Sequence, residues 1–224
     1  MSHAREPADA WRLDTASARA VQRRLATAVR LDDATGPVGT VAGVDTGFAA
    51  GGQRARACVA VFRYPEITPL TQSVAERPVT FPYRTGLLAF RELPAILAAL
   101  DGLDAPPDLL LCDGQGVAHP RRLGIAAHLG VWLDRPSIGV GKSRLLGTYQ
   151  EPGRDRGSEV PLYDGSDRIG TVLRSRTGVR PLFVSPGHRV DHAAAALWVL
   201  ACTGRYRLPE PLRQADRIAS QRGQ

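Results

Sequence analysis

The sequence predicts an α/β protein with one mixed central sheet flanked by helices. Three strand-like runs follow one another with only turn residues between them, and short apolar runs then alternate with helical patterns. An antiparallel meander followed by parallel βα units gives a mixed sheet covered on both faces. The 224 residues, 43% of them hydrophobic, suffice for one core. We therefore expect a single domain over residues 1–224, with flexible ends at 1–10 and 221–224.

The first half of the chain predicts a helix and then the meander. Residues 11–31 place apolar side chains at i, i+4 and i+8 with arginines between them, which is typical of an amphipathic helix. Gly51-Gly52 separates the first two strand-like runs, and Tyr64-Pro65 ends the second. The meander strands are expected at residues 40–48, 56–64 and 71–79.

The second half predicts alternating strands and helices. A helix at 90–103 tolerates Pro94 only near its first turn, because proline has no N–H to donate to the helical ladder. Asp191 is suited to cap the last expected helix. The polar stretch 150–166 is interpreted as a surface excursion. Further helices are expected at residues 121–133 and 191–201, and strands at 107–112, 137–140, 168–176 and 182–185.

The chain is basic, and nearly all of the excess is arginine. Lys and Arg total 29 against 22 for Asp and Glu, a formal net charge of +7. Arginine binds phosphate through two N–H groups, so a nucleic-acid partner is one interpretation, and arginine enrichment through coding bias is the other. The three cysteines lack zinc-ligand spacing, and reduced thiols suit a cytoplasmic protein. The N-terminus lacks the apolar core of a signal peptide, and no apolar run reaches the ~18–20 residues of a membrane span.

Three acids lie at the ends of expected elements. Asp113 follows a buried strand and precedes a glycine-rich turn, Asp45 follows another apolar run, and Glu92 begins a helix. An acid at the exit of a buried strand is costly unless something neutralises it. Carboxylate oxygens suit Mg²⁺, and acids from separate elements can converge on such an ion. Taken singly, each acid is better explained as a cap or turn residue, and spacing alone does not prove convergence.

Two further side chains follow expected strands. Lys142 is positioned to neutralise phosphate charge, and His188, beside a glycine turn, to orient or deprotonate a water molecule. The alternative for His188 is an ordinary surface-loop histidine. Two nucleotide-binding motifs are incomplete, which argues against a nucleotide cofactor. Pro136 replaces the first glycine of a P-loop, and His119 replaces the third glycine of a dinucleotide fingerprint.

The loop after the meander carries an aromatic ring between a proline and an arginine. Pro82, Tyr83 and Arg84 are consecutive. An aromatic face stacks on nucleic-acid bases, and a ring on a stiff loop can open a base step. The alternative is a tyrosine that covers the edge of the core.

Together these stretches resemble the endonuclease V family of DNA repair nucleases. The similarity extends from about Val41 to Ser220. Each motif alone is weak, but their order and spacing together are specific. The matching motifs are Gly43-Val44-Asp45, the stretch from Pro82-Tyr83 through Phe90-Arg91-Glu92, Asp113-Gly114-Gln115-Gly116 with His119-Pro120-Arg121, Pro136-Ser137-Ile138-Gly139-Val140-Gly141-Lys142, Ser185-Pro186-Gly187-His188, and Tyr206-Arg207-Leu208-Pro209 with Arg213 and Ala215-Asp216.

The resemblance implies an RNase H-like fold, Mg²⁺ with Mn²⁺ as a substitute, and cleavage of damaged DNA at the second phosphodiester bond 3′ to deoxyinosine. It implies Asp45 and Asp113 as principal metal ligands, with Glu92 completing the acidic set. His188 would handle the attacking water, and Lys142 would assist at the phosphate.

The resemblance also implies a pocket for a flipped base. Tyr83 would fill the gap left in the stack, with Pro82 and Arg84 beside it in the same loop. The family usually has Pro-Tyr-Ile-Pro at this loop, so Arg84 and Thr85 are departures that leave a less stiff wedge. Close backbone approach would admit hypoxanthine and exclude guanine, which carries an extra amine. The pocket would be built around Gly86, Leu88, Gly114, Gly116, His119, Gly124 and Ile125.

Two alternatives remain open at this point. One is a nuclease of the same fold that acts on inosine-containing RNA, and the other is a non-catalytic lesion-binding module. The joint presence of the acids and His188 argues against the second. We expect a cytoplasmic monomer that acts on double- or single-stranded damaged DNA and has no membrane partner.

Overall fold

The computed structural model describes residues 11–220, so the expectation of flexible ends at 1–10 and 221–224 lies outside the described residues. The helices are α1 (Thr15–Ala26), η2 (a 3-10 turn, Ala50–Gly52), α2 (Ala89–Asp101), α3 (Ile125–Leu133), α4 (His192–Ala201) and α5 (Glu210–Ala219). The strands are β1 (Thr40–Ala49), β2 (Arg54–Arg63), β3 (Thr68–Pro78), β4 (Leu109–Asp113), β5 (Ser137–Gly141), β6 (Glu159–Asp164), β7 (Asp167–Leu173) and β8 (Leu182–His188).

The strands form one mixed sheet of eight, in the order β3-β2-β1-β4-β5-β8-β7-β6. The predicted meander is present, since β1, β2 and β3 pair antiparallel. The strands β1, β4 and β5 run parallel to one another, while β8 returns antiparallel to β5 and continues into β7 and β6. The expected combination of an antiparallel meander with parallel strands is thereby confirmed.

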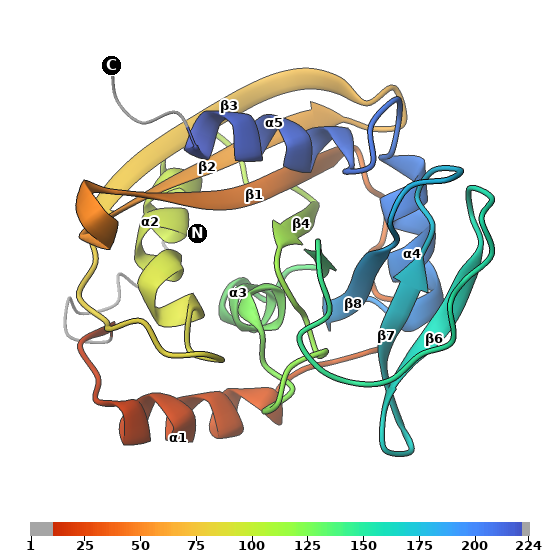
Figure 1. The fold of residues 1–224 in the computed structure, drawn as a ribbon. Coiled ribbons are helices and arrows are strands. Elements are labelled where there is room, and N and C mark those ends of the chain that lie inside the picture. The colour runs from red at the N-terminus through yellow and green to blue at the C-terminus, as the bar shows by residue number, and fades with distance from the viewer. Residues whose placement is uncertain (1–10, 221–224) are drawn as a thin grey trace.

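Helices cover both faces of the sheet (Figure 1). Because side chains alternate along a strand, Ala42 and Val44 of β1 face α2 and α3, whereas Val41 faces the layer that contains α4. Helix α5 packs on β2 on that second face, through Ala215, Ile218 and Ala219. Helix α1 lies outside α3, and Ala18 connects it to the larger core.

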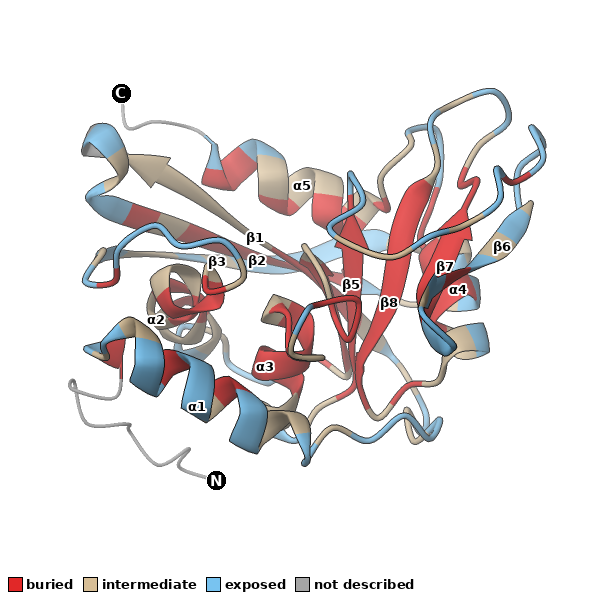
Figure 2. Ribbon diagram, turned by 60° about the horizontal axis from the view of Figure 1, so that its bottom comes forward, coloured by how far each residue is buried: buried red, intermediate tan, exposed pale blue. Residues whose placement is uncertain are grey.

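Burial is greatest at the centre of the sheet. Every residue of β5 and of β8 is buried, whereas β3 at the edge is mostly exposed (Figure 2). Helix α1 presents an exposed outer side to solvent. Among residues 11–220, no helix combines the length and apolar character needed to cross a membrane.

Several element boundaries differ from the expectations, each for a local reason. The first helix begins only at Thr15, because Asp14 caps it by accepting a hydrogen bond from the Ser17 N–H at 2.7 Å. Pro94 lies in the second turn of α2, deeper than expected. The stretch 150–166 contains β6, an edge strand with mostly polar exposed residues, so its interpretation as a mere excursion is wrong. Asp191 caps α4 as expected.

Candidate active site

The register of two parallel strands brings the first two acids together. Val44 of β1 pairs with Cys112 of β4, so Asp45, in the middle of β1, and Asp113, at the end of β4, come next on two neighbouring parallel strands. Both side chains belong to the alternation that faces α5, because they are even steps from Val41 and Leu109. The convergence that spacing alone left open follows from this register.

A third acid comes from helix α5. The helix lies directly on β1, because a Cβ at Gly43 would sit 2.1 Å from the Pro211 carbonyl carbon, and one at Gly47 would sit 2.3 Å from the Ala219 oxygen. Only glycine permits this close approach on either side of Asp45. Oxygen atoms of Asp45, Asp113 and Asp216 lie within 4.8 Å of one another.

The charges of this cluster are strongly coupled. Burial, followed by the negative charge of Asp113, raises the pKa of Asp45 to about 7. Burial and the charges of Asp45 and Asp113 likewise raise the pKa of Glu92 to about 8. Glu92 lies in the first turn of α2 and faces the same site, although it is not one of the three tightly grouped acids. All three acids expected from the sequence therefore meet here, joined by Asp216.

Lys142 is the only lysine among the 224 residues, and it binds this cluster. Its Nζ lies 2.6 Å from Asp113 Oδ2 and 2.7 Å from Asp216 Oδ1. Burial disfavours the ammonium, but these two hydrogen bonds outweigh burial and raise the pKa of Lys142 above its usual value. One cation thus compensates part of the charge of a cluster that has more carboxylates than cations.

The donor set fits a hard divalent cation. All three grouped side chains offer carboxylate oxygens, which Mg²⁺ and Mn²⁺ prefer. Mutual repulsion already favours protonation of Asp45, and a dication held between the acids would remove that repulsion. Asp45, Asp113 and Asp216 are the residues that would hold such an ion.

A pocket of about 270 Å³ adjoins the acids. Asp113 and Glu92 line one side of it, so the acidic cluster and the pocket share residues. Six of the residues expected to surround a flipped base line this pocket, namely Gly86, Leu88, Gly114, His119, Gly124 and Ile125. Tyr83 and Thr85 also line it, together with Gln22, Ala89, Gln115, Leu123, Ser143, Arg144 and Leu145.

Three expected contacts lie outside the pocket lining. Gly116 is buried against strand β8, where a Cβ would meet the Pro186 oxygen at 1.9 Å, so its role is close packing of two backbones. Pro82 and Arg84 are exposed on the loop that carries Tyr83, and Tyr83 itself is 65% exposed. The loop therefore presents its aromatic ring to solvent at the mouth of the pocket.

His119 lines the pocket as a neutral ring. Burial, followed by the positive charge of Arg121, lowers the pKa of His119 to about 4. Its Nδ1 lies 3.2 Å from the Arg121 backbone N–H and accepts from it, so the hydrogen-bond pattern assigns the ring proton to Nε2. Nε2 then donates to the Gly86 carbonyl at 3.0 Å. Both ring nitrogens are engaged by protein, which leaves only the ring surface for a base.

His188 is not brought to the acids. Strand β8 runs antiparallel to β5, so Val184 lies level with Val140 and Asp113, and His188 lies four residues further along. Four strand residues span ~13 Å toward the opposite edge of the sheet.

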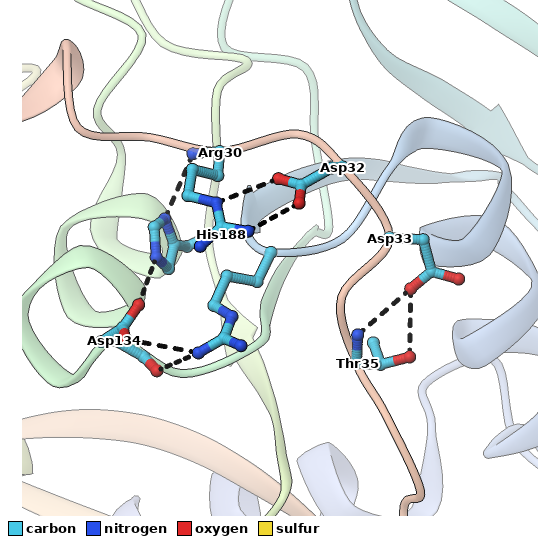
Figure 3. A network of polar contacts seen from close by, with 7 residues as sticks. Arg30, Asp32, Asp33, Thr35, Asp134 and His188 are labelled. Carbon is cyan, nitrogen blue, oxygen red and sulfur yellow. Dashed lines mark hydrogen bonds and ion pairs between the residues drawn. The ribbon is translucent and has the colours of Figure 1, made fainter.

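At that edge the side chain of His188 is buried and bonded on both sides (Figure 3). Its Nδ1 lies 3.2 Å from the Arg30 backbone N–H, and its Nε2 lies 3.1 Å from an Asp134 carboxylate oxygen. Arg189 also contacts Asp134. These contacts tie the segment after α1 to the sheet, so the structure does not bring His188 to the acids as the water-handling expectation requires.

Sequence reasoning gave no role to Asp216 or Gln22. Asp216 closes the last family motif, and the apolar residues Leu212, Ala215 and Ile218 have helical spacing that could have revealed α5. Gln22 carries no such signal, because it is one polar residue within the expected amphipathic helix.

The sheet order, with acids in the middle of β1 and at the end of β4, defines an RNase H-like protein with the acidic site of a nuclease. The family model of Endonuclease V matches residues 23–217. The chain belongs to the Endonuclease V family.

Relatives and solved structures agree with this membership. The Endonuclease V of Alkalilimnicola ehrlichii is 57% identical over 94% of this chain and 93% of its own length. The crystal structure of the Streptomyces avermitilis Endonuclease V is 46% identical, with a TM-score of 0.90 over 95% of this chain and 94% of that one. The Ciona intestinalis Endonuclease V, 27% identical with a TM-score of 0.79 over 91% of this chain and 95% of that one, was crystallised with a 24mer DNA containing an inosine followed by a ribo-adenosine.

Proposed function

We propose that this protein is a metal-dependent endonuclease that recognises deoxyinosine in DNA and hydrolyses the second phosphodiester bond 3′ to it. The observation that carries the proposal is the contact between the acidic cluster and the pocket, which share Asp113 and Glu92. When a base is held in the pocket, the DNA strand that carries this base lies beside the acids. Family membership and the inosine-containing DNA bound by the Ciona relative support the same substrate.

The acids would hold Mg²⁺ or Mn²⁺ through Asp45, Asp113 and Asp216. Such an ion, when bound, lowers the pKa of water and stabilises charge on a phosphate. Glu92, which lines the pocket beside Asp113, would complete the acidic set around such an ion. Lys142 supplies a compact positive charge at the phosphate side of the cluster.

The pocket would take the base after it leaves the stack. Flipping costs a few kcal/mol and is least costly for a poorly paired base such as inosine. Tyr83, exposed at the pocket mouth, would occupy the vacated position in the duplex. The backbone around Gly114 and Gly124, which both line the pocket, would contact the edge of the base.

A nicking assay tests this proposal. A duplex with one deoxyinosine, labelled at the 5′ end of that strand, should be cut at a single position 3′ to the lesion in Mg²⁺ and not in EDTA. Asp113→Asn should bind the same duplex and fail to cut it. Equal cutting of a matched duplex with adenine, or cutting by Asp113→Asn at the parental rate, would contradict the proposal.

Inosine-containing RNA is the second candidate substrate. The Ciona relative was crystallised with a ribonucleotide directly after the inosine, so that protein accepts a 2′-OH at this position. Paired DNA and RNA oligonucleotides of one sequence with a single inosine decide between them. We also propose that the protein acts as a monomer in the cytoplasm, where its three free cysteines would stay reduced.

A further inference from the structure

Gln22 is a buried polar side chain that joins helix α1 to the pocket. It is 1% exposed and lines the pocket from below the Tyr83 loop. Its Nε2 donates to the Gly86 carbonyl at 3.0 Å and to the Leu123 carbonyl at 3.2 Å. Its Oε1 accepts from Arg121 Nε at 2.5 Å. One amide group thus satisfies three partners on two different walls of the pocket.

The Gly86 carbonyl is the centre of this arrangement. It accepts from Gln22, from Arg121 Nη2 at 2.6 Å and from His119 Nε2 at 3.0 Å. Gly86 has a φ of +76°, and a Cβ there would lie 2.8 Å from Arg121. Glycine is therefore required for the backbone to turn its carbonyl toward these donors.

The other end of the Tyr83 loop is held as well. Arg91 donates to the Phe81 carbonyl at 2.9 Å and to the Gly52 carbonyl at 3.1 Å. The Arg91 guanidinium lies 6.0 Å from the centre of the Tyr83 ring. Residues 82–85 therefore lie between two residues, Phe81 and Gly86, whose carbonyls are held by hydrogen bonds. These hydrogen bonds supply the stiffness that the family's second proline, here replaced by Thr85, is expected to give the loop.

We propose that Gln22 is a positioning residue that fixes the Tyr83 loop to the opposite pocket wall and thereby sets the selectivity for the flipped base. The proposal deepens the proposed function and rests on it, since it assigns the pocket to a base. Gln22 touches neither the acids nor the bond to be cut. Its effect passes through Gly86 on one wall and through Leu123 and Arg121 on the other.

The arrangement also explains which base is refused. The Gly86 carbonyl that Gln22 holds already accepts from three donors, so it offers no acceptor to an additional amine on a bound base. Guanine differs from hypoxanthine by such an amine, and a buried donor without a partner is unfavourable. Loss of Gln22 would release the Leu123 carbonyl and leave Arg121 and His119 alone to hold the Gly86 carbonyl, which would let the two walls move apart more easily.

Gln22→Met tests the proposal, because methionine keeps the length of the side chain and removes every hydrogen bond. Gln22→Met loses three hydrogen bonds, and we expect KM for a deoxyinosine duplex to rise at least ~10-fold, with kcat changed much less. Cutting at inosine relative to a matched guanine duplex should fall by a similar factor. Hydrogen exchange at residues 84–88 should speed up, and this measurement requires no nuclease activity.

Three control variants separate positioning from general destabilisation. Gln22→Glu keeps an acceptor for Arg121 and loses both donors, so it should resemble Gln22→Met. Gln72→Met makes the same exchange at an exposed position of β3 and should behave as wild type. Thr203→Val removes a buried hydrogen bond to Val199 far along the chain on α4, and should lower Tm without changing selectivity.

The outcomes distinguish this inference from the proposed function. If wild type cuts at inosine and Gln22→Met keeps the same KM, selectivity and exchange at 84–88, the positioning role is overturned. If wild type shows no preference for inosine, the proposed function fails instead. In that case hydrogen exchange at residues 84–88 still decides whether Gln22 fixes the Tyr83 loop. Unchanged exchange in Gln22→Met would overturn the fixing of the loop as well.

Discussion

Asp45 and Asp216 face each other across the contact between strand β1 and helix α5, one from each end of the described chain. The helix can come this close only because Gly43 and Gly47 flank Asp45 on the strand. The third acid of the cluster therefore depends on backbone packing as much as on its own side chain.

Asp216 should matter for cleavage as much as the acids that lie on strands. We expect Asp216→Asn to slow nicking of a deoxyinosine duplex at least ~10–100-fold, the loss that even an outer partner of a metal ligand causes. The folded state should persist, because the side chain is 43% exposed. Asp101→Asn, an exposed exchange at the end of α2, serves as the control. Nicking by Asp216→Asn at the wild-type rate would exclude Asp216 from the site.

Lys142 should compete with a divalent ion for the same carboxylates. Removing its charge in Lys142→Met should tighten Mg²⁺ binding about fivefold in calorimetry, as expected for the loss of one or two partly exposed ion pairs of ~0.5–1 kcal/mol each. Nicking should nevertheless slow, because the phosphate loses a nearby cation. Lys142→Arg keeps the charge and should keep the weaker Mg²⁺ binding. Equal affinity in all three proteins would refute the competition.

Tyr83 should act in lesion binding without acting in hydrolysis. Tyr83→Ala should weaken binding to a deoxyinosine duplex in EDTA by ~1–3 kcal/mol, the contribution of one stacked aromatic ring. Tyr83→Phe keeps the ring and should bind as wild type. A Tyr83→Ala protein that still separates inosine from adenine duplexes as well as wild type would show that the ring does not enter the stack.

His188 should affect stability and leave hydrolysis almost unchanged. His188→Ala removes two buried hydrogen bonds, to Arg30 and to Asp134, and should lower the free energy of unfolding by ~1–3 kcal/mol. Below its melting temperature the variant should nick with a kcat within about threefold of wild type, because ~13 Å of strand separates it from the acids. A large loss of kcat in a fully folded His188→Ala protein would restore the water-handling role.

The stability of the protein should fall as the solution is acidified below pH ~6.5, where histidine in the unfolded chain takes up a proton. Burial lowers the pKa of His128 to about 3, and His128 packs among Trp11, Phe90 and Trp132. The His128 ring stays neutral in the folded protein while it becomes charged in the unfolded chain. Its contribution to stability is therefore fully present above the pKa of the unfolded state and is lost as the pH falls toward the pKa of the folded state. Each such histidine contributes a loss of ~1.4 kcal/mol per pH unit within that window.

His128→Phe provides the test, with urea unfolding measured between pH 7 and pH 5. His119 keeps its own contribution, because its pKa is also depressed, to about 4. The slope of stability against pH should therefore decrease in His128→Phe without vanishing. An unchanged slope would mean that His128 does not remain neutral in the folded protein.

The sequence was sufficient where function follows strand ends. Asp45 and Asp113 could be predicted because each follows a short apolar run, and Gly86 and Gly124 because the family resemblance implies them in the pocket. His188 also lies at the end of a strand, and the sequence therefore predicted it beside the acids, but it lies toward the opposite edge of the sheet. Local patterns give the position of a strand but not its direction, and β8 runs opposite to β5.

Asp216 and Gln22 required the three-dimensional structure for other reasons. The docking of α5 depends on glycines more than 160 residues earlier in the chain, and no local pattern encodes that contact. Gln22 acts through backbone carbonyls of loops that are distant in sequence. Because a backbone carbonyl is present whatever the side chain is, the residue types of these loops do not reveal the contact. Edge strand β6 was missed because it is short, contains Pro161 and buries only Leu162 fully, so it carries little of the apolar alternation of a strand.

The attachment of α5 to the two glycines of β1 also determines when the protein becomes chemically competent. Asp45 lies on β1 and Asp113 on β4, both in the earlier part of the chain, whereas Asp216 lies on α5, the last described helix. A fragment cut anywhere between residues 113 and 216, or a chain whose last helix has not yet docked, holds an incomplete set of acids. Formation of the complete acidic cluster thus waits for the docking of the last described helix, and a chain that is folded only in part lacks the third acid.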